Sequence, residues 1–430
     1  MIGHNRDPVP PASKIPRMAG SLRQRRGRGR VPREPDRSHF PDSSHSRSQG
    51  RPQDRLATVS PPSPPRPSPD PFRYAAGTPP RPRAVRAAPP PHRRDTPRMG
   101  LLMRILVTGG AGFIGSQFVR ALLSEELPSG RDARVTVLDN LTYSGNEANL
   151  APVADLPGYT FVRGDIRDPG TVDEAVRGQD AVVHFAAESH VDRSILDSAP
   201  FVTTNVLGTQ TLLDAARRHG VGRFVHVSTD EVYGSIAEGS WTEDWPLAPN
   251  SPYSASKAGS DLLALSYHRT HGMDVVVTRC SNNYGQYHFP EKMIPLFTTN
   301  LLDGKKVPLY GEGLNVRDWL HVSDHCRGIE LVLRDGRAGE IYHIGGGTEV
   351  TNKELTGLLL DACGAGWDMV EHVEDRKGHD LRYSLSIGKI QEELGYAPRV
   401  SFAAGLADTV QWYRDNRAWW EPLKAKAALA

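Results

Sequence analysis

From residue 104 onward the sequence predicts an α/β fold, a doubly wound parallel sheet followed by a smaller C-terminal α/β domain. Short runs rich in β-branched residues, such as RILVTG, RVTVLDN and DAVVHFAA, alternate with stretches of helical periodicity such as FIGSQFVRALLSE. This alternation is typical of a parallel sheet with helices on both faces. After residue 283 the alternation loosens into loops and short helices, which indicates the smaller domain.

The first 98 residues differ in composition from the rest of the chain. They hold 22 of the 35 prolines and carry 21 Lys and Arg against 7 Asp and Glu, a net charge of +14, whereas residues 99–430 carry 31 against 43, a net charge of −12. Such a segment buries too little apolar surface to offset chain entropy, so we predict a disordered basic arm. Met99 and Met103 directly precede an ordinary first strand. We therefore expect that the arm is upstream sequence, translated because the start of the chain is misassigned. A tether to nucleic acid or to an acidic surface is the less favoured alternative, as is a Pro-rich ligand for a partner domain.

Other features of the sequence predict a cytoplasmic protein without a metal site. No run of 18 apolar residues occurs, so we expect no membrane span. The arm also lacks the apolar core of a secretory signal, so we do not expect it to be one. Cys280, Cys326 and Cys363 are odd in number and widely spaced, which fits neither a disulfide framework nor a zinc pattern. His190 has no second ligand at a suitable spacing, so we expect it to have a positioning or structural role.

The first predicted strand ends in a glycine-rich loop, TGGAGFIG, which opens a helix. We predict that Gly109 makes the tight turn, that Gly112 lets a pyrophosphate approach backbone amides, and that Gly115 lets helix and strand pack closely. The second strand ends in Asp139, 24 residues after Gly115. An acid there accepts from a ribose 2′-hydroxyl and repels a 2′-phosphate, so the pattern predicts a Rossmann-type site for NAD rather than NADP.

Two further strand ends favour a dinucleotide site. Asp165 and Ile166 follow the third strand, where an adenine edge is read, and the alternative for Asp165 is an N-cap to a helix over Pro169–Arg177. Phe185, Ala186 and Ala187 end the fourth strand with mostly small residues, which close approach of a cofactor requires.

Two short stretches predict redox and acid–base chemistry. Tyr253 and Lys257 lie four residues apart, on one face of a helix. The ammonium, together with the positive ring of NAD, lowers the pKa of the phenol, so that it takes a hydroxyl proton as hydride leaves. Asp230 and Glu231 stand side by side after the strand RFVHVST. One carboxyl group kept protonated by its neighbour's charge makes the pair both acid and base; the alternative is an acidic pair stabilised by a helix dipole.

The motifs TGGAGFIG, HFAAESHVDRS, STDEVYG, YSASK and SNNYG resemble the extended short-chain dehydrogenase/reductase family of nucleotide-sugar enzymes. Within it, RCSNNYG, FPEKMIPL, GLNVRDWLHVSDH, IGGGTEVTN and DRKGHDLRY recur in the order of the dTDP-glucose 4,6-dehydratases. This resemblance covers residues 103–430 and implies NAD-dependent conversion of dTDP-glucose to dTDP-4-keto-6-deoxyglucose. The steps are oxidation at C4, loss of water across C5–C6 and return of hydride to C6. A different nucleotide-sugar 4,6-dehydratase, a 4-epimerase of the same fold and a non-catalytic dinucleotide-binding module are the alternatives.

The resemblance also implies roles for the matched residues. Thr229 bonds the sugar 4-hydroxyl, Tyr253 is its base and Lys257 tunes Tyr253, while Asp230 is the acid and Glu231 the base of water loss. The implied cofactor contacts are Gly109, Gly112, Phe113, Ile114, Gly115, Asp139, Asn140, Leu141, Thr142, Asp165, Ile166, Phe185, Ala186, Ala187, Ser189, Thr204, Tyr253, Lys257 and Asn283. The implied substrate contacts are Ser189, Thr229, Asn282, Lys292, Arg317, Asn352, Arg376 and His379.

The same resemblance implies which part of the chain binds which ligand. Residues 99–283 bind NAD, a later segment near 317–345 returns to that domain, and residues 284–430 mainly bind the nucleotide sugar. It also implies a homodimer that forms through helices near 197–218 and 253–271.

This sequence departs from the family pattern at a few positions. Lys377 replaces an expected proline, Gln286 and His288 alter the segment before FPEK, and His343 stands where Asn is common. We expect these departures to affect specificity rather than the class of reaction, with Lys377 loosening a substrate loop.

Overall fold

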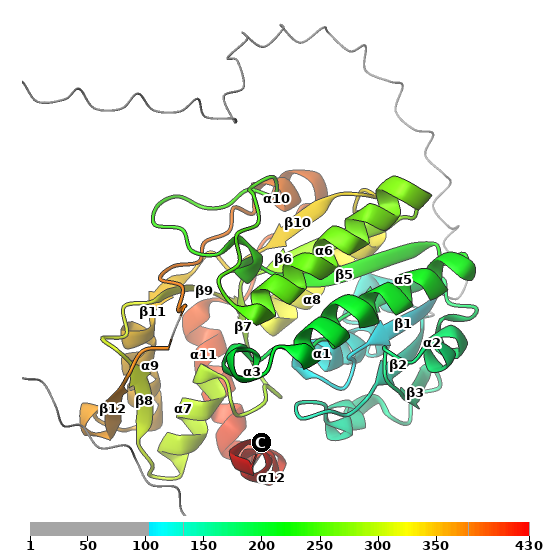
Figure 1. Ribbon diagram of the computed structural model, residues 1–430. Helices are drawn as coiled ribbons and strands as arrows, with labels where there is room; N and C mark the ends of the chain where they lie inside the picture. The colour runs from blue at the N-terminus through cyan, green and yellow to red at the C-terminus, as the bar shows by residue number, and fades with distance from the viewer. Residues whose placement is uncertain (1–102, 132, 377, 430) are drawn as a thin grey trace, which may run out of the picture. The chain divides into compact units, whose positions relative to one another are not determined.

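The computed structural model describes residues 103–131, 133–376 and 378–429 (Figure 1). The predicted arm and Lys377 lie outside these residues. A seven-stranded sheet has the order β3-β2-β1-β4-β5-β6-β10, and every neighbouring pair is parallel. Its strands are β1 (Arg104–Thr108), β2 (Arg134–Asp139), β3 (Tyr159–Arg163), β4 (Ala181–His184), β5 (Arg223–Thr229), β6 (Val275–Cys280) and β10 (Ile341–Ile344). The predicted doubly wound parallel sheet is confirmed, and its first six strands have the Rossmann order.

Helices cover both faces of this sheet (Figure 1). One face packs against α1 (Phe113–Leu123) and α8 (Val322–Asp335). The other packs against α2 (Pro169–Val176), α5 (Thr209–Arg218) and α6 (Pro252–His271). Side chains alternate along each strand, so both faces need apolar residues, and strands such as β1 and β6 therefore have apolar residues at consecutive positions.

The later part of the chain adds two small sheets. β7 (Asn282–Tyr284), β9 (Val316–His321) and β11 (Glu349–Thr351) form one, while β8 (Val307–Tyr310) and β12 (Val370–Val373) form the other. A separate apolar cluster joins them to α7 (Met293–Leu302), α9 (Asn352–Cys363) and α11 (Phe402–Asp415). The chain then continues through α12 (Arg417–Leu429).

The segment near 317–345 is shared between these parts. Its first strand, β9, pairs with β7 and β11, whereas α8 and β10 belong to the seven-stranded layer, where α10 (Gly388–Leu394) also packs. The domain boundaries given above stay a prediction.

Short helical segments fill the connections. They are η1 (Pro128–Gly130), η2 (Glu147–Val153), α3 (Val191–Leu196), α4 (Ala199–Phe201), the π-helix η3 (Val202–Gly208), η4 (Asp230–Tyr233) and η5 (Trp367–Met369). Several of them follow strands at the carboxyl edge of the sheet, where ligands of such folds bind. Among the described residues, no helix has the length and apolar character needed to cross a membrane.

Candidate active site

One cavity of about 620 Å³ lies beyond the carboxyl ends of the parallel strands and extends to β8, β9 and α9. Each predicted site residue lines it, with the exception of Leu141. The structure therefore brings together groups that are spread from residue 109 to residue 379.

The glycine-rich loop between β1 and α1 forms one wall of the cavity. Gly109 has φ +69°, and a Cβ on it would lie 2.5 Å from the amide nitrogen of Ala186, while a Cβ on Gly115 would lie 2.3 Å from the Gly109 carbonyl oxygen. The protein's own packing thus requires both glycines. A Cβ on Gly112 would meet only the Gly109 oxygen, at 3.2 Å. Gly112 is the N-cap of α1 and no side chain caps this helix, which fits a pyrophosphate at the helix N-terminus.

Asp139 is fixed at the end of β2 by backbone amides. Its Oδ2 accepts from Ala111 N at 2.9 Å and its Oδ1 accepts from Leu141 N at 2.8 Å. Burial raises the pKa of Asp139, and the two amide bonds lower it. Each carboxylate oxygen keeps a second lone pair for a ribose hydroxyl. The amide of Leu141 therefore orients the acid, which is its contribution although it does not line the cavity.

The alternative role of Asp165 as a helix N-cap is wrong. The N-cap of α2 is Asp168, whose Oδ1 accepts from Gly170 N at 3.1 Å. Asp165 instead pairs with Arg167 at 2.6 Å and accepts from Asn140 Nδ2 at 3.0 Å. Pro169 at the first helical position points to the residue just before it as the cap, so the signal was present in the sequence.

Asp230 and Glu231 open the short helix η4 directly after β5. Thr229 Oγ1 accepts from Glu231 N at 3.3 Å and donates to Asp230 Oδ1 at 3.2 Å. The other oxygen of Asp230 is buried and has no hydrogen-bond partner in the described part of the chain. Burial raises the pKa of Asp230 well above its usual range, and the nearby charges of Glu231 and Asp318 raise it further. This environment favours the protonated form.

Glu231 experiences a different field from its neighbour. Burial raises its pKa, but the cations Lys292, Arg376 and Arg317 lower it. Ser254 Oγ also donates to Glu231 Oε2 at 3.2 Å. Burial therefore raises the pKa of both carboxyl groups, but the nearby acids raise that of Asp230 further whereas three cations offset part of the rise at Glu231, so Asp230 is the better proton donor and Glu231 the better base of the pair.

Tyr253 and Lys257 lie in the first two turns of α6, whose N-cap is Ser251. Lys257 Nζ donates to the Val227 carbonyl at 2.8 Å, and burial lowers the pKa of this lysine. Burial raises the pKa of Tyr253 well above its usual range, and Glu231 raises it further. This direction is opposite to the predicted lowering, which counted the positive cofactor ring as well as Lys257.

A buried polar chain that sequence reasoning missed lies behind these groups. Arg279 Nε donates to Asp261 Oδ2 at 2.9 Å, and Arg279 Nη1 donates to the Tyr233 hydroxyl at 2.5 Å. The hydroxyl lies 2.6 Å from His343 Nε2, and His343 Nδ1 lies 3.0 Å from the Ser386 carbonyl. Burial lowers the pKa of His343 to about 3, so its neutral ring donates to the carbonyl and accepts from the tyrosine. Arg279 thereby joins α6, which carries the Tyr–Lys pair, to η4, which carries the acids.

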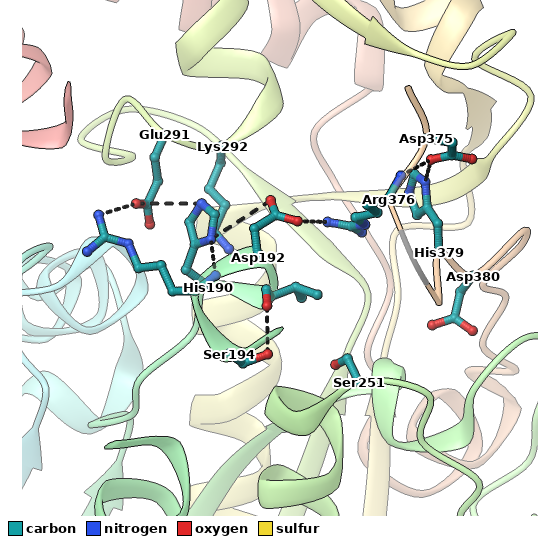
Figure 2. A network of polar contacts seen from close by, with 12 residues as sticks. His190, Asp192, Ser194, Ser251, Glu291, Lys292, Asp375, Arg376, His379 and Asp380 are labelled. Carbon is teal, nitrogen blue, oxygen red and sulfur yellow. Dashed lines mark hydrogen bonds and ion pairs between the residues drawn. The ribbon is translucent and has the colours of Figure 1, made fainter. Parts of the chain in front are cut away.

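Charged side chains from three separate segments meet on the substrate side of the cavity (Figure 2). Asp192 Oδ1 lies 3.7 Å from Arg376 Nη1, and His190 Nε2 lies 3.7 Å from Glu291 Oε2. Lys292 Nζ donates to the Ser189 carbonyl at 2.9 Å. Burial and nearby cations, Lys292 foremost, lower the pKa of His190 to about 4, so its ring is neutral at pH 7.

The remaining substrate-side residues are held to different degrees. Arg317 is fixed by backbone carbonyls, including Asp380 O at 2.8 Å, and lies 4.1 Å from the ring centroid of Tyr383. His379 Nδ1 lies 2.6 Å from Asp375, and Asn352 is buried at the start of α9.

The two adjacent asparagines of β7 differ in whether the protein itself binds their side chains. Asn283 Nδ2 donates to Ser281 O at 2.9 Å, and its Oδ1 lies 2.9 Å from His325 Nδ1. Asn282 Oδ1 is buried and has no partner among the residues that the structure describes. Asn282 is therefore the one with an acceptor to offer a ligand, while the side chain of Asn283 is occupied by the protein itself.

The sheet order, the glycine-rich loop and the Tyr–Lys pair define an extended short-chain dehydrogenase/reductase. Residues 106–409 match the family model described as GDP-mannose 4,6 dehydratase. The dTDP-glucose 4,6-dehydratase of Streptomyces niveus is 70% identical over 323 residues, which cover 75% of this chain and 96% of the relative. The chain belongs to this family, and within it to the dTDP-glucose 4,6-dehydratases.

Solved structures give the same grouping. DesIV of Streptomyces venezuelae, a dTDP-glucose 4,6-dehydratase solved with NAD and dTDP, is 68% identical with a TM-score of 0.74, covering 75% of this chain and all of that one. A UDP-glucose 4-epimerase of Thermus thermophilus, solved with NAD, is 35% identical with a TM-score of 0.67, covering 73% of this chain and 100% of that one. The fold is thus shared with epimerases, so the reaction has to be argued from the site.

Proposed function

We propose that this protein catalyses the NAD-dependent dehydration of dTDP-glucose to dTDP-4-keto-6-deoxyglucose. The observation that carries the proposal is the pair Asp230 and Glu231, two neighbouring buried carboxyl groups, of which only Glu231 has several cations among its main neighbours, within the cavity that holds Tyr253 and Lys257. A 4-epimerase has no need of such a pair, because it removes no water. The name of the 70% identical relative supports the same reaction.

The residues of the cofactor side fit NAD. The N-terminus of α1 has no side-chain cap and so suits the pyrophosphate, and Asp139 offers lone pairs for a ribose hydroxyl while it repels a 2′-phosphate. When bound, NAD accepts a hydride from the sugar C4 and returns it to C6. We assign NAD binding to residues 99–283 and binding of the nucleotide sugar mainly to residues 284–430.

The chain's own groups move the protons. Tyr253 takes the proton of the 4-hydroxyl, which Thr229 orients, and we assign the stabilisation of its phenolate to the positive ring that NAD would supply when bound, together with Lys257. The ketone at C4 acidifies the C5 proton, so Glu231 can remove it. Asp230 then gives its proton to the C6 hydroxyl as the C6–O bond breaks, and water leaves. Saturation of the C5–C6 double bond by hydride at C6 and a proton at C5 completes the product.

Three cations suit a nucleoside diphosphate. Arg317 and Arg376 can each bind two phosphate oxygens at once, and Lys292 supplies a point charge. All three line the cavity, and all three lower the pKa of Glu231. We infer that the diphosphate of the substrate binds beside the catalytic acids, with the sugar reaching toward them.

Product analysis tests the proposed reaction. Purified protein is incubated with dTDP-glucose, and in parallel with UDP-glucose and GDP-mannose. We expect a 4-keto-6-deoxy sugar that absorbs in alkali, formed fastest from dTDP-glucose. Unchanged sugar or an epimer as the only product would reject the proposal.

We further propose a cytoplasmic homodimer. Several large apolar side chains are exposed on the adjoining segments α3, η3 and α6, among them Leu196 at 87%, Leu262 at 56% and Val202 at 52%. Such a patch is typical of a protein interface. Sedimentation equilibrium should show dimers that Leu262→Glu weakens, and a monomeric wild-type protein would refute the dimer. Fractionation of the producing cells tests the location.

A further inference from the structure

The C-terminal helix α12 is firmly anchored at its start. Trp420 is fully buried, and its Nε1 donates to the Tyr413 carbonyl at 2.7 Å. Arg417 and Lys424 bond the same carboxylate, that of Asp303, at 2.7 and 2.8 Å. The helix therefore has a defined position rather than a frayed one.

From this position α12 reaches the glycine-rich loop through a single buried residue. Trp419 Nε1 donates to Asn149 Oδ1 at 3.0 Å, and Asn149 Nδ2 donates to the Ala111 carbonyl at 2.9 Å. Asn149 is 1% exposed. Both ends of its amide are thus used, so it links residue 419 to the loop in which we place the pyrophosphate.

Neighbouring contacts hold this link in place. Arg120, in α1, donates to the Asn149 carbonyl at 2.6 Å and lies 4.2 Å from the ring centroid of Tyr287. Tyr287 in turn packs against Trp419, with ring centroids 5.5 Å apart. The indole N–H of Trp419 is therefore directed by packing toward Asn149.

A second contact reaches the next proposed cofactor segment. Lys426 Nζ donates to the Thr142 carbonyl at 3.0 Å. Thr142 follows β2 and lines the cavity. One helix thus bonds, by two different side chains, to the connection between β2 and β3, and Asn149 of this connection bonds in turn to the loop that follows β1.

We propose that α12 is a clamp that retains the dinucleotide, in which Trp419 acts through Asn149 and Lys426 acts through Thr142. The inference rests on the proposed function. A reaction that returns its hydride regenerates NAD at each turnover. Slow release of NAD therefore does not slow the turnover of such an enzyme. In this proposal, release moves the connection between β2 and β3 away from the loop after β1, and the bonds from α12 to that connection resist the movement.

The rate of cofactor exchange tests the clamp. Protein loaded with NAD is mixed with an excess of fluorescent etheno-NAD, and the half-time of exchange is measured without any sugar substrate. Trp419→Phe keeps the ring contacts but loses the N–H, and loss of one hydrogen bond should speed exchange about two- to tenfold. Lys426→Met should give a smaller acceleration, and the double variant a larger one.

A matched control and a second ligand separate the clamp from general loosening. Trp367→Phe changes a half-exposed tryptophan of η5 and should leave exchange at the wild-type rate. Affinity for dTDP should be unchanged in all variants. If Trp419→Phe and Lys426→Met both exchange NAD at the wild-type rate, the clamp is wrong. If the wild-type protein takes up no NAD, the proposed function fails instead. Lys426 is exposed, so Lys426→Met should fold normally. This variant therefore still tests the clamp if Trp419→Phe folds poorly.

Discussion

The cofactor end and the substrate end of the cavity are built in different ways. At the cofactor end the backbone sets the shape, because Gly109 and Gly115 tolerate no Cβ and both oxygens of Asp139 accept backbone amides. At the substrate end long charged side chains such as Lys292 and Arg376 extend from separate loops.

The polar atoms show the same contrast. Asp230 Oδ2, Asn282 Oδ1 and Arg376 Nε are buried and have no hydrogen-bond partner within the described residues. Unpaired buried polar groups are costly, and a polar ligand that pairs with them removes that cost. A rigid end thus suits a cofactor that stays, whereas an end with unpaired groups suits a sugar nucleotide that enters and leaves.

Glu231→Gln should have the largest effect at the substrate end. The amide cannot take the C5 proton, and loss of a general base lowers kcat by about 10²–10⁴-fold. Binding of NAD and dTDP should persist, because the shape of the side chain is kept. Steady-state rates with dTDP-glucose, together with calorimetric binding of dTDP, measure both. Normal turnover would place the base elsewhere.

Arg376→Met should raise KM for dTDP-glucose and shift the pH profile. Removing a charged hydrogen-bond donor weakens binding by about 10- to 100-fold. The cation also lowers the pKa of Glu231, so its loss raises that pKa. A base with a higher pKa is protonated at higher pH, and the acid limb of kcat/KM should therefore move to higher pH. Arg382→Met is the matched control, because Arg382 pairs with Glu349 and does not line the cavity. An acid limb that stays in place in Arg376→Met would disprove the electrostatic link.

Two glycine variants sharpen the comparison at the cofactor end. Gly115→Ala places a methyl group 2.3 Å from a backbone oxygen, and overpacking of this kind destabilises by about 1–3 kcal/mol. Gly112→Ala meets its nearest atom at 3.2 Å, so the fold should survive while NAD binding weakens. Thermal unfolding with and without NAD separates the two effects. Equal melting temperatures for both variants in the absence of NAD would contradict this account.

The same contrast explains what the sequence could predict. The strand ends, the glycine-rich loop and the Tyr–Lys pair are local patterns, in which period and spacing fix the geometry. Thr229 to Glu231 could be placed in the site for this reason. Asp168 shows that even a local pattern can be misread, since Pro169 marks it as the helix cap.

The rest depends on which distant side chains meet. Arg279, Tyr233 and His343 form one hydrogen-bonded chain although they lie up to 110 positions apart, and no spacing rule predicts that. His288, a departure from the family pattern, stacks on Phe113 of the glycine-rich loop with ring centroids 4.1 Å apart. Contacts of this kind follow from packing of the whole fold, so they become visible only in three dimensions.

Asp192→Asn should have the smallest effect and probes how freely the substrate end rearranges. Asp192 is 40% exposed at its side chain and lies 3.7 Å from Arg376, a pair of the kind that contributes less than about 1 kcal/mol. Its carboxylate competes with a diphosphate for the same guanidinium, so the neutral amide should tighten dTDP binding by less than about fivefold and leave kcat unchanged. Titration calorimetry at low and high salt measures this, and the gain should shrink with salt. Weaker binding in the variant would mean that Asp192 holds Arg376 in its binding position, and the substrate end would then be as preorganised as the cofactor end.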